Sequence, residues 1–299
     1  MEPTQIITII LIALGALNMV GNIIMYIMFM IKMRDVISGG VKKDQIMMYG
    51  CLVLIIFFLA GYVFVAIVDH SSLITGFIMF FGSIFVTVTI LLLISLIKTS
   101  KIRSLEIAQI LVDIIDARGS LYGHSTHVKN LMLVFYKHMP RHLRGDFSVV
   151  SLEFAALLHD IGNLNVPEEI LLKNDDLTPE EWEKMKTHPQ VGVRLLRSIS
   201  SFDFISDWIL YHHERADGKG YYFKSNDSIP LPSKMLAIAD AYSAMTIGRV
   251  YNPPKSHEEA IEELKKESDV QFDRELVDIF ASIPKKEMEG CVPEREGKF

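Results

Sequence analysis

Hydrophobic residues dominate the first hundred positions of the chain and then give way to an amphipathic pattern. Three nearly uncharged runs, 6–30, 48–68 and 73–97, each reach or exceed the roughly 20 residues that a helix needs to cross a bilayer. Helices are expected because an unpaired backbone polar group in lipid is costly. The first run is longer than the apolar core of a secretory signal peptide, and no basic segment precedes it. The pattern predicts a membrane region over residues 1–98 with three transmembrane helices.

Basic residues around these runs predict their orientation. The connection between the second and third runs, VDHSS, carries no lysine or arginine. Basic residues instead lie between the first two runs and directly after the third: Lys32, Arg34, Lys42, Lys43, Lys98, Lys101 and Arg103. Because positively charged flanks stay in the cytoplasm, we expect the amino terminus outside and the chain after Lys98 inside the cell. Lipid is then the partner of the membrane region.

After Lys98 the apolar residues recur at helical spacing, without the long alternating pattern of a strand. The third run is expected to continue into a juxtamembrane helix and linker over 99–123, where a homodimer contact is plausible. Its apolar series is Ile102, Leu105, Ile107, Ala108, Ile110, Leu111 and Ile114. Ser151 opens the apolar stretch LEFAALLHDIG, which predicts a short helix that ends near Gly162.

Two further helix starts are marked by capping boxes. Thr178 precedes Pro179 and is followed three positions later by Glu181, and Ser256 with Glu259 repeats the arrangement. These signals predict helices over EEWEKMKTH and AIEELKKE. The part of the chain after the membrane region is therefore expected to be an all-α bundle with its own core.

Composition and charge narrow the possible partners. The chain is 50% hydrophobic with a mean hydropathy of +0.28, and its net charge is −6. This acidic balance argues against a duplex nucleic-acid partner. Cys51 and Cys291 form no spaced framework and are expected to be unpaired thiols. Residues 284–299 mix charge with proline and glycine, so a disordered tail is expected there.

Histidine and aspartate recur within the apolar helices. Taken singly, such a histidine is more often a hydrogen-bonded core residue, and such an aspartate a cap or an ion-pair partner. Together, so many ionisable groups in one apolar domain require a common partner, and metal ions provide one. The candidate ligands are His124 in GHSTHV, His159 and Asp160 in LLHDIGN, His188 in MKTHPQVG, His212 and His213 in YHHER, and Asp240 in AIADAYS.

The number of candidate ligands suits two ions. Carboxylate and imidazole without thiolate favour Mn, Fe, Co or Zn in a carboxylate-bridged site. Asp160 can bridge through its two oxygens, with His124, His159 and Asp240 around one ion and His188, His212 and His213 around the other. Two such ions activate water and stabilise charge on a phosphoryl group, which predicts phosphoester hydrolysis.

The ordered motifs His124-Ser125, LHDIG, LTPEEWEKMKTHPQVG, HHERADGKGY, AIADAY and GRVY resemble the HD-GYP domain, a bacterial cyclic di-GMP phosphodiesterase family of the HD superfamily. The resemblance covers about residues 105–283. It implies an all-α fold, a centre of iron or manganese ions and hydrolysis of cyclic di-GMP. Together with the three apolar runs, a bacterial family implies a place in the inner (cytoplasmic) membrane. In the trinuclear version a glutamate stands four residues before the first ligand histidine. Ser120 stands there, so the resemblance implies two ions.

The resemblance also shows departures around the substrate. It implies substrate or catalytic contacts for Asn163 and Arg249, beside the bridging Asp160, and a wall of the site for Tyr251. Asn163, however, replaces a lysine and carries no charge to offset a phosphate. Ser243 replaces an aspartate, Asn252 a basic residue, and Tyr222 the proline of the GYP motif, which is expected to leave that loop freer.

Other residues around the ligands keep two interpretations. His127, one turn after His124, can reach the site, or it can lie at the surface or behind a ligand. Glu214 can orient a ligand imidazole or pair at a helix end, and Asp217 can cap the DGKG turn or contact a ligand histidine. The remaining residues of this loop are Gly218 and Gly220, expected to allow positive φ, and Tyr221 of the GY pair.

Three functions fit these observations. The first is a membrane-anchored phosphodiesterase for a cyclic dinucleotide, with two divalent ions, Fe or Mn. The second is a receptor of weakened or absent catalysis that binds a nucleotide or a partner protein. The third is a hydrolase for another phosphoester, with the same ions and a different substrate contact.

Overall fold

The computed structural model describes residues 2–37, 42–68, 72–119, 122–145, 147–197, 200–247 and 253–293. The chain divides into two compact units, Met1–Ser104 and Leu105–Phe299. Within the described residues no strand forms, and the only bridge is isolated, between Ser268 and Phe272. The expected all-α class is confirmed.

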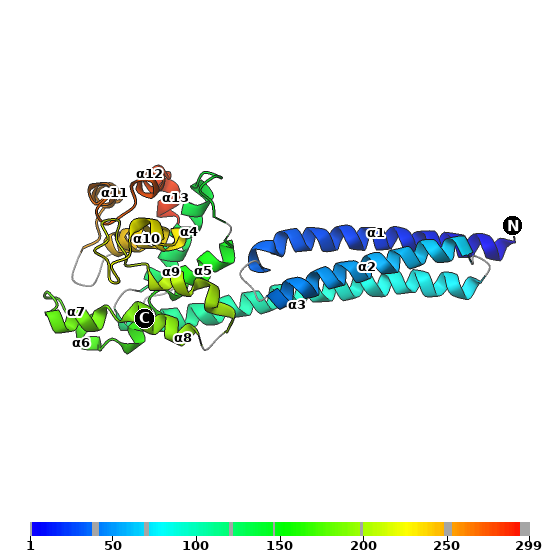
Figure 1. Ribbon diagram of the computed structural model, residues 1–299, viewed down its shortest axis with the longest axis horizontal. Coiled ribbons are helices and arrows are strands. Elements are labelled where there is room, and N and C mark those ends of the chain that lie inside the picture. Colours follow the sequence, from blue (N-terminus) through cyan, green and yellow to red (C-terminus); the bar gives the residue numbers. More distant parts are fainter. Residues whose placement is uncertain are drawn as a thin grey trace. The chain divides into compact units, whose positions relative to one another are not determined.

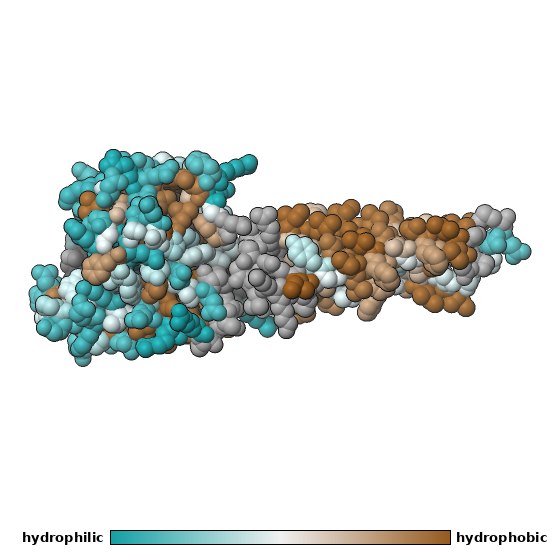
Figure 2. Space-filling model, viewed as in Figure 1, coloured by the Kyte–Doolittle hydropathy of each residue, from teal (hydrophilic) through white to brown (hydrophobic). Residues whose placement is uncertain are grey.

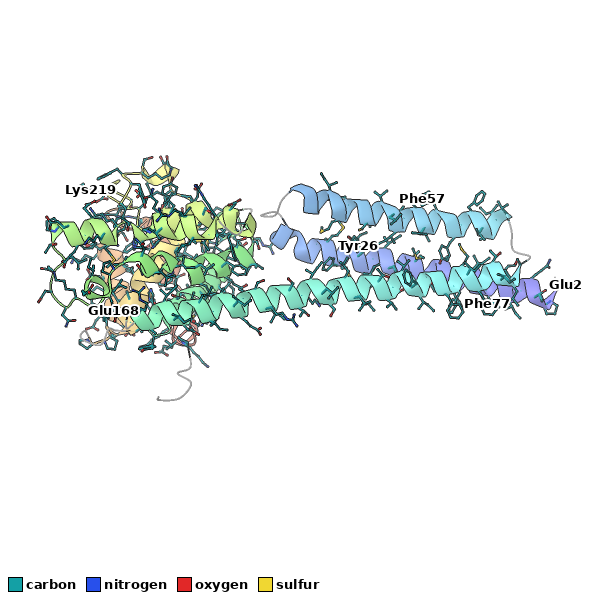
Figure 3. The ribbon with its side chains drawn as sticks, turned by 90° about the horizontal axis from the view of Figure 1, so that it is seen from below. Glu2, Tyr26, Phe57, Phe77, Glu168 and Lys219 are labelled. Carbon is teal, nitrogen blue, oxygen red and sulfur yellow. The ribbon has the colours of Figure 1, made fainter. Side chains whose placement is uncertain are left out.

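The first unit contains three long apolar helices, α1 (Pro3–Ile37), α2 (Lys42–Val68) and the start of α3 (Leu73–Arg118) (Figure 1). All three are long and apolar enough to span a membrane. Hydrophobic side chains cover their surface in Figure 2. Phe57 on α2 is 71% exposed, whereas Tyr26 on α1 is buried (Figure 3). Such an apolar exterior suits lipid better than water, as the sequence predicted.

Polar side chains join α1 to α3 inside this unit. The Asn18 amide donates to the hydroxyls of Ser83 and Thr87, at 3.1 and 3.0 Å. Thr87 in turn donates to Asn22 Oδ1 at 2.9 Å. Interhelical bonds of this kind hold apolar helices together where the hydrophobic effect between them is weak.

The second unit is a bundle of short helices that follows the end of α3. In chain order these are α4 (His124–His138), α5 (Val149–Leu158), η1 (Ile161–Asn165), α6 (Glu168–Leu171), α7 (Pro179–Met185), α8 (His188–Leu196), η2 (Ser200–Ile205), α9 (Ser206–Leu210), η3 (Asn226–Ser228), α10 (Leu231–Ile247), α11 (His257–Lys266), α12 (Arg274–Ala281) and α13 (Lys285–Glu289). As expected, α3 continues without a break past the apolar run to Arg118.

Local signals explain where several of these helices begin. Both capping boxes form, at the starts of α7 and α11. Helix α5 begins at Val149, two positions before Ser151, because the Ser148 hydroxyl caps it by accepting the Val150 N–H. It ends at Leu158, and the 3₁₀ helix η1 takes the chain through Gly162.

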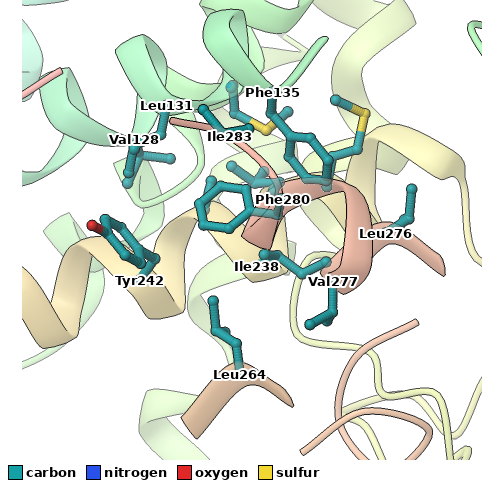
Figure 4. Packing of buried hydrophobic residues seen from close by; sticks show 14 of the residues in the cluster. Val128, Leu131, Phe135, Ile238, Tyr242, Leu264, Leu276, Val277, Phe280 and Ile283 are labelled. Carbon is teal, nitrogen blue, oxygen red and sulfur yellow. The ribbon is translucent and has the colours of Figure 1, made fainter. Parts of the chain in front are cut away.

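Two apolar clusters hold the second unit together. In one, Phe135 of α4 meets Phe280 of α12 edge to face, and Tyr242 of α10 packs on the same phenyl ring (Figure 4). In the other, the end of α3 packs through Val112 and Ile115 against α5, α8 and α9. Helices of both clusters carry the candidate ligands, most of them at helix ends. The packing of the two clusters therefore fixes where those side chains meet.

The carboxyl-terminal segment differs from the expected disorder at residues 284–293. Helix α13 forms there, and Met288 and Cys291 are buried in the first of these clusters. The Cys291 carbonyl also accepts a hydrogen bond from Asn130 of α4 at 2.9 Å. The burial of these apolar side chains stabilises the segment despite the charged residues around them. Cys51 and Cys291 are unpaired, as expected, and residues 294–299 lie outside the described part.

Candidate metal centre

Seven candidate ligands converge on one place in the second unit. Six of them lie at or just beyond helix ends, and the seventh lies inside a helix. His124 begins α4 and His188 begins α8, whereas His159 and Asp160 follow α5. His212 and His213 follow α9, and Asp240 lies within α10. Side chains at helix ends can leave the helix surface, which lets five segments meet.

The ligand atoms form three overlapping groups, each within 4.8 Å. They are Asp160 with His188, His212 and His213; Asp160 with His124 and His159; and Asp240 with His159 and His212. Asp160 belongs to two of them. Its Oδ2 lies 3.6 Å from His159 Nε2, and its Oδ1 lies 3.3 Å from His188 Nε2. One carboxylate thus faces both halves of the cluster, the arrangement of a bridging ligand.

Hydrogen bonds fix the tautomer of three of these imidazoles. In His159, His188 and His212, Nδ1 lies 2.7, 2.8 and 2.6 Å from the carbonyl three residues earlier. A carbonyl only accepts, so Nδ1 carries the proton and Nε2 keeps its lone pair. The same arrangement orients many metal-binding histidines.

The three Nε2 atoms are buried and make no hydrogen bond within the described residues. Unpaired polar atoms are costly to bury, and here they gather beside two carboxylates. A cation would satisfy all of them at once. The donor set, imidazole nitrogen and carboxylate oxygen without thiolate, suits divalent transition metals. The residues present therefore fit a metal centre.

Burial and neighbouring groups keep three side chains of this cluster in the protonation state that can bind a metal ion. Burial and the neighbouring His188 lower the pKa of His213 to about 3, and burial also holds the pKa of His212 well below its ordinary value. Burial alone would raise the pKa of Asp160, but its electrostatic interaction with the adjacent His159 and His188 lowers it. At neutral pH His212 and His213 are therefore neutral and Asp160 is ionised.

Asp240 and His124 form the exception. Burial opposes charge on both groups, yet their mutual hydrogen bond, at 3.1 Å, lowers the pKa of Asp240 and raises the pKa of His124. A proton held between these two groups would compete with a metal ion for His124 Nε2. This side of the cluster is the more sensitive to pH.

A glycine contact brings η1 against α8. A Cβ atom on Gly162 would lie 1.8 Å from the His188 carbonyl oxygen and 2.7 Å from the Gly192 nitrogen. Only glycine permits this approach, which sets Asp160 beside His188. This role of Gly162 was not predicted from the sequence, although the residue lies in the LHDIG motif.

The loop after His213 is organised by Glu214. Its two carboxylate oxygens accept the backbone N–H groups of Tyr222 and Lys224, at 2.6 and 2.7 Å. Glu214 is buried, and within the described residues both of its oxygens hold this loop rather than a ligand imidazole or a cation. The Tyr222 N–H contributes a hydrogen bond to this loop that proline at the same position could not donate.

The other residues of the loop have mainly backbone roles. Asp217 caps the turn by accepting the Lys219 N–H at 3.0 Å, and it pairs with Arg215. Gly218 has the expected positive φ, 74°. Gly220 does not: it is needed because a Cβ would lie 2.5 Å from the Glu214 Cα. The Tyr221 ring packs 4.7 Å from the ring of His213.

Ser243 and His127 take part in a contact that the sequence analysis missed. The Ser243 hydroxyl lies 2.9 Å from Nδ1 of His124 and 3.0 Å from Nδ1 of His127, and all three residues are buried. His127 is therefore an interior residue. Residue spacing could have predicted this contact. On α4, His127 follows His124 by three positions, and on α10, Ser243 follows Asp240 by three, so each pair lies on one helix face.

The substrate residues are only partly described. Asn163 lies in η1, and its side-chain oxygen is buried without a hydrogen-bond partner within the described residues. Arg249, Tyr251, Asn252 and Ser120 lie outside the described residues.

Residues 105–276 match the family described as HD domain. The chain belongs to the HD domain family. Relatives agree with the HD-GYP resemblance found from the motifs. A cyclic di-GMP phosphodiesterase of Thermotoga maritima is 40% identical over 141 residues, 46% of this chain and 38% of the relative. A 3′3′-cGAMP-specific phosphodiesterase of Vibrio cholerae is 31% identical over 193 residues, 63% of this chain and 35% of the relative.

The chain thus spans little more than a third of these two relatives. Among solved structures, the HD domain of the phosphodiesterase PgpH of L. monocytogenes aligns with a TM-score of 0.44 and 16% identity, over 60% of this chain and 96% of that one. An HD-GYP-type protein of Bdellovibrio bacteriovorus aligns with a TM-score of 0.43 and 20% identity, over 55% and 52%.

Proposed function

We propose that this HD domain protein is a membrane-anchored, metal-dependent phosphodiesterase that hydrolyses a cyclic dinucleotide, with cyclic di-GMP as the first candidate. The observation that carries the proposal is the set of three buried, unpaired Nε2 atoms gathered around Asp160 and Asp240. Relatives named as phosphodiesterases for cyclic di-GMP and for 3′3′-cGAMP support the substrate class.

Two divalent ions fit the overlapping ligand groups, and the oxygen and nitrogen donors suit Mn, Fe, Co or Zn. The HD-GYP resemblance favours Fe or Mn among these. When bound, such ions supply an activated water and stabilise charge on a phosphoryl group. The chain's own residues orient the ligands, since the carbonyls behind three imidazoles fix the tautomers. Asp160 and Asp240 keep side-chain exposures of 17% and 21%, so solvent reaches the carboxylate side of the cluster.

The direct test is hydrolysis by the full chain in lipid nanodiscs, loaded anaerobically with Fe²⁺ or Mn²⁺. Cyclic di-GMP, 3′3′-cGAMP and cyclic di-AMP are supplied separately, and linear products are separated by chromatography. Asp160→Ala is the inactive control, because it removes the shared ligand. Absence of turnover with all three substrates, while metal is bound, would contradict the proposal. Turnover of cyclic di-AMP alone, or of another phosphoester only, would favour the third function, a hydrolase with the same ions and a different substrate.

Asn163 supports a second candidate, a receptor that binds nucleotide without cleaving it. Its neutral side chain, whose oxygen is buried, follows Asp160 by three positions, where the resembled family carries a lysine. A neutral amide gives a phosphate less stabilisation than an ammonium group does. The receptor predicts binding of cyclic di-GMP without product, and cleavage on Asn163→Lys. If that variant binds but does not cleave, the missing lysine is not the reason for inactivity.

We also propose that the three apolar helices lie in the bacterial inner membrane with the amino terminus outside and the HD domain in the cytoplasm. The distribution of basic residues supports this orientation. Labelling of single cysteines by a membrane-impermeant maleimide in spheroplasts tests it. A cysteine that replaces Ser72 should react, and one that replaces Ser225 of the HD domain should not; Cys51→Ser removes the native thiol of the membrane region.

A homodimer through α3 is the last element of the proposal. Ile107, Ile110 and Ile114 are 55–60% exposed, and they lie on one face of α3, whereas Val112 and Ile115 are buried within the domain. Two copies in one membrane present this face in parallel, at the spacing of a two-helix contact. Ile110→Cys should crosslink between copies, and Ile110→Lys should leave monomers in light scattering.

A further inference from the structure

The last turn of α3 contacts the segment that carries His124. Asp116 is 4% exposed, and its two oxygens accept the Ser125 N–H at 3.0 Å and the Ser125 hydroxyl at 2.7 Å. Ser125 follows His124 in the first turn of α4, whose N-cap is Gly123, a residue with no capping side chain. Asp116 therefore supplies from α3 the carboxylate that caps a helix N-terminus.

The same turn contacts the segment that carries Asp160. The Arg118 guanidinium donates from Nη1 to the carbonyls of Leu164 and Asn163, at 3.1 and 3.4 Å, and from Nη2 to that of Val166 at 3.4 Å. These carbonyls lie at the end of η1, which directly follows Asp160. Carbonyls at a helix end lack partners within the helix, so a cation there is stabilising.

Each charge meets the helix end that it suits: the carboxylate meets an N-terminus and the guanidinium meets a C-terminal end. Because the two residues are two positions apart on α3, their side chains diverge and reach different segments. The last turn of α3 thus joins the two halves of the ligand cluster. A shift of α3 along or about its axis would disturb both ends together.

We propose that Asp116 and Arg118 are positioning residues of the metal centre, Asp116 for His124 and Arg118 for Asp160, so that the placement of α3 controls how the ions are held. The inference rests on the proposed two-ion centre. It makes a differential prediction. Asp116 acts on one ligand group, whereas Arg118 acts through Asp160 on both.

The test is a titration of the full chain in nanodiscs with Mn²⁺, in which free Mn²⁺ is measured by electron paramagnetic resonance. His124→Ala identifies the ion on the His124 side. Asp116→Ala should weaken only that ion, by about tenfold, and Arg118→Met should weaken both ions by about tenfold or more, within the range known for residues behind metal ligands. Asp116→Asn keeps an acceptor and Arg118→Lys keeps a charge, so each should recover most of the affinity.

Matched controls are Asp113→Ala, an exposed carboxylate on the same helix, and Arg141→Met, an exposed arginine between helices. Both should bind two ions as the wild type does. Wild-type affinity in Asp116→Ala and Arg118→Met would overturn the inference. Equal weakening of both ions by Asp116→Ala would also overturn it, since that indicates general loss of structure. If the metal pattern appears without turnover of any cyclic dinucleotide, only the proposed function fails; if the wild type binds no Mn²⁺, both fail.

Discussion

The Ser243 hydroxyl lies 2.9 Å from Nδ1 of His124, in the buried interior of the HD domain. The same hydroxyl lies 3.0 Å from Nδ1 of His127. A hydroxyl has one proton, so it donates to one imidazole and accepts from the other. If His124 binds a metal through Nε2, its own proton stays on Nδ1 and points at Ser243. The serine then donates to His127.

Ser243→Ala should destabilise the fold, because it leaves two buried imidazole nitrogens without partners. We expect the free energy of unfolding to fall by about 1–3 kcal/mol, measured by urea unfolding of the metal-free protein. Ser206→Ala is the matched control, since the Ser206 hydroxyl is buried and makes no hydrogen bond within the described residues. Equal decreases in the free energy of unfolding of the two variants would show that the Ser243 hydrogen bonds do not stabilise the fold.

Gly162→Ala should separate η1 from α8 and thereby Asp160 from His188. The added Cβ would lie 1.8 Å from the backbone oxygen of His188, so the backbone of one of the two segments must shift. We expect a stability loss of about 3 kcal/mol or more, together with loss of bound Mn²⁺. Gly192→Ala faces the same contact, but its Cβ would lie 3.3 Å from Ile161 Cγ2, and alanine favours the helix. It should stay near wild type; comparable losses in both variants would count against the role of Gly162.

Tyr222→Pro should weaken the loop after His213, although proline is the residue of the GYP motif. Proline removes the N–H that the buried Glu214 accepts at 2.6 Å. We expect a loss of about 1–3 kcal/mol and faster hydrogen exchange at the Lys224 amide, which Glu214 also holds. Tyr222→Phe keeps the N–H and the ring, and should lose less. Slower exchange in Tyr222→Pro would mean that a rigid φ outweighs the lost hydrogen bond.

Metal binding should fall in two steps as the pH falls. The Asp240 contact raises the pKa of His124 above its ordinary value, so this imidazole takes up a proton first and then has no lone pair for a metal. His212 and His213, with lowered pKa values, stay neutral to more acidic pH. Equilibrium dialysis between pH 8 and pH 5, an illustrative range around the ordinary histidine pKa, should show two bound Mn²⁺, then one, then none. Loss of both ions in a single step would contradict this order.

Much of this protein follows from local sequence. The apolar runs determine the three long helices, because length and hydropathy alone decide whether a helix suits lipid. Thr178 and Ser256 begin their helices because a capping box involves only neighbouring residues. The cluster of candidate ligands was predictable because neither histidine nor aspartate is stable in an apolar interior without a partner. The ordered motifs also indicated the family to which the chain belongs.

Tertiary structure decided the contacts between residues far apart in sequence. Arg118 reaches η1 and Ser243 joins two histidines of another helix only because the helices pack in this arrangement. The Tyr222 N–H donates to Glu214, which lies eight positions earlier. Apolar contacts place Met288 and Cys291 in the core, although the segment 284–293 is rich in charged residues. Local propensity cannot encode such pairings, since each depends on burial shared by several segments. The sequence by itself determined the helices and the ligand chemistry, whereas packing decided which groups hold those ligands in place.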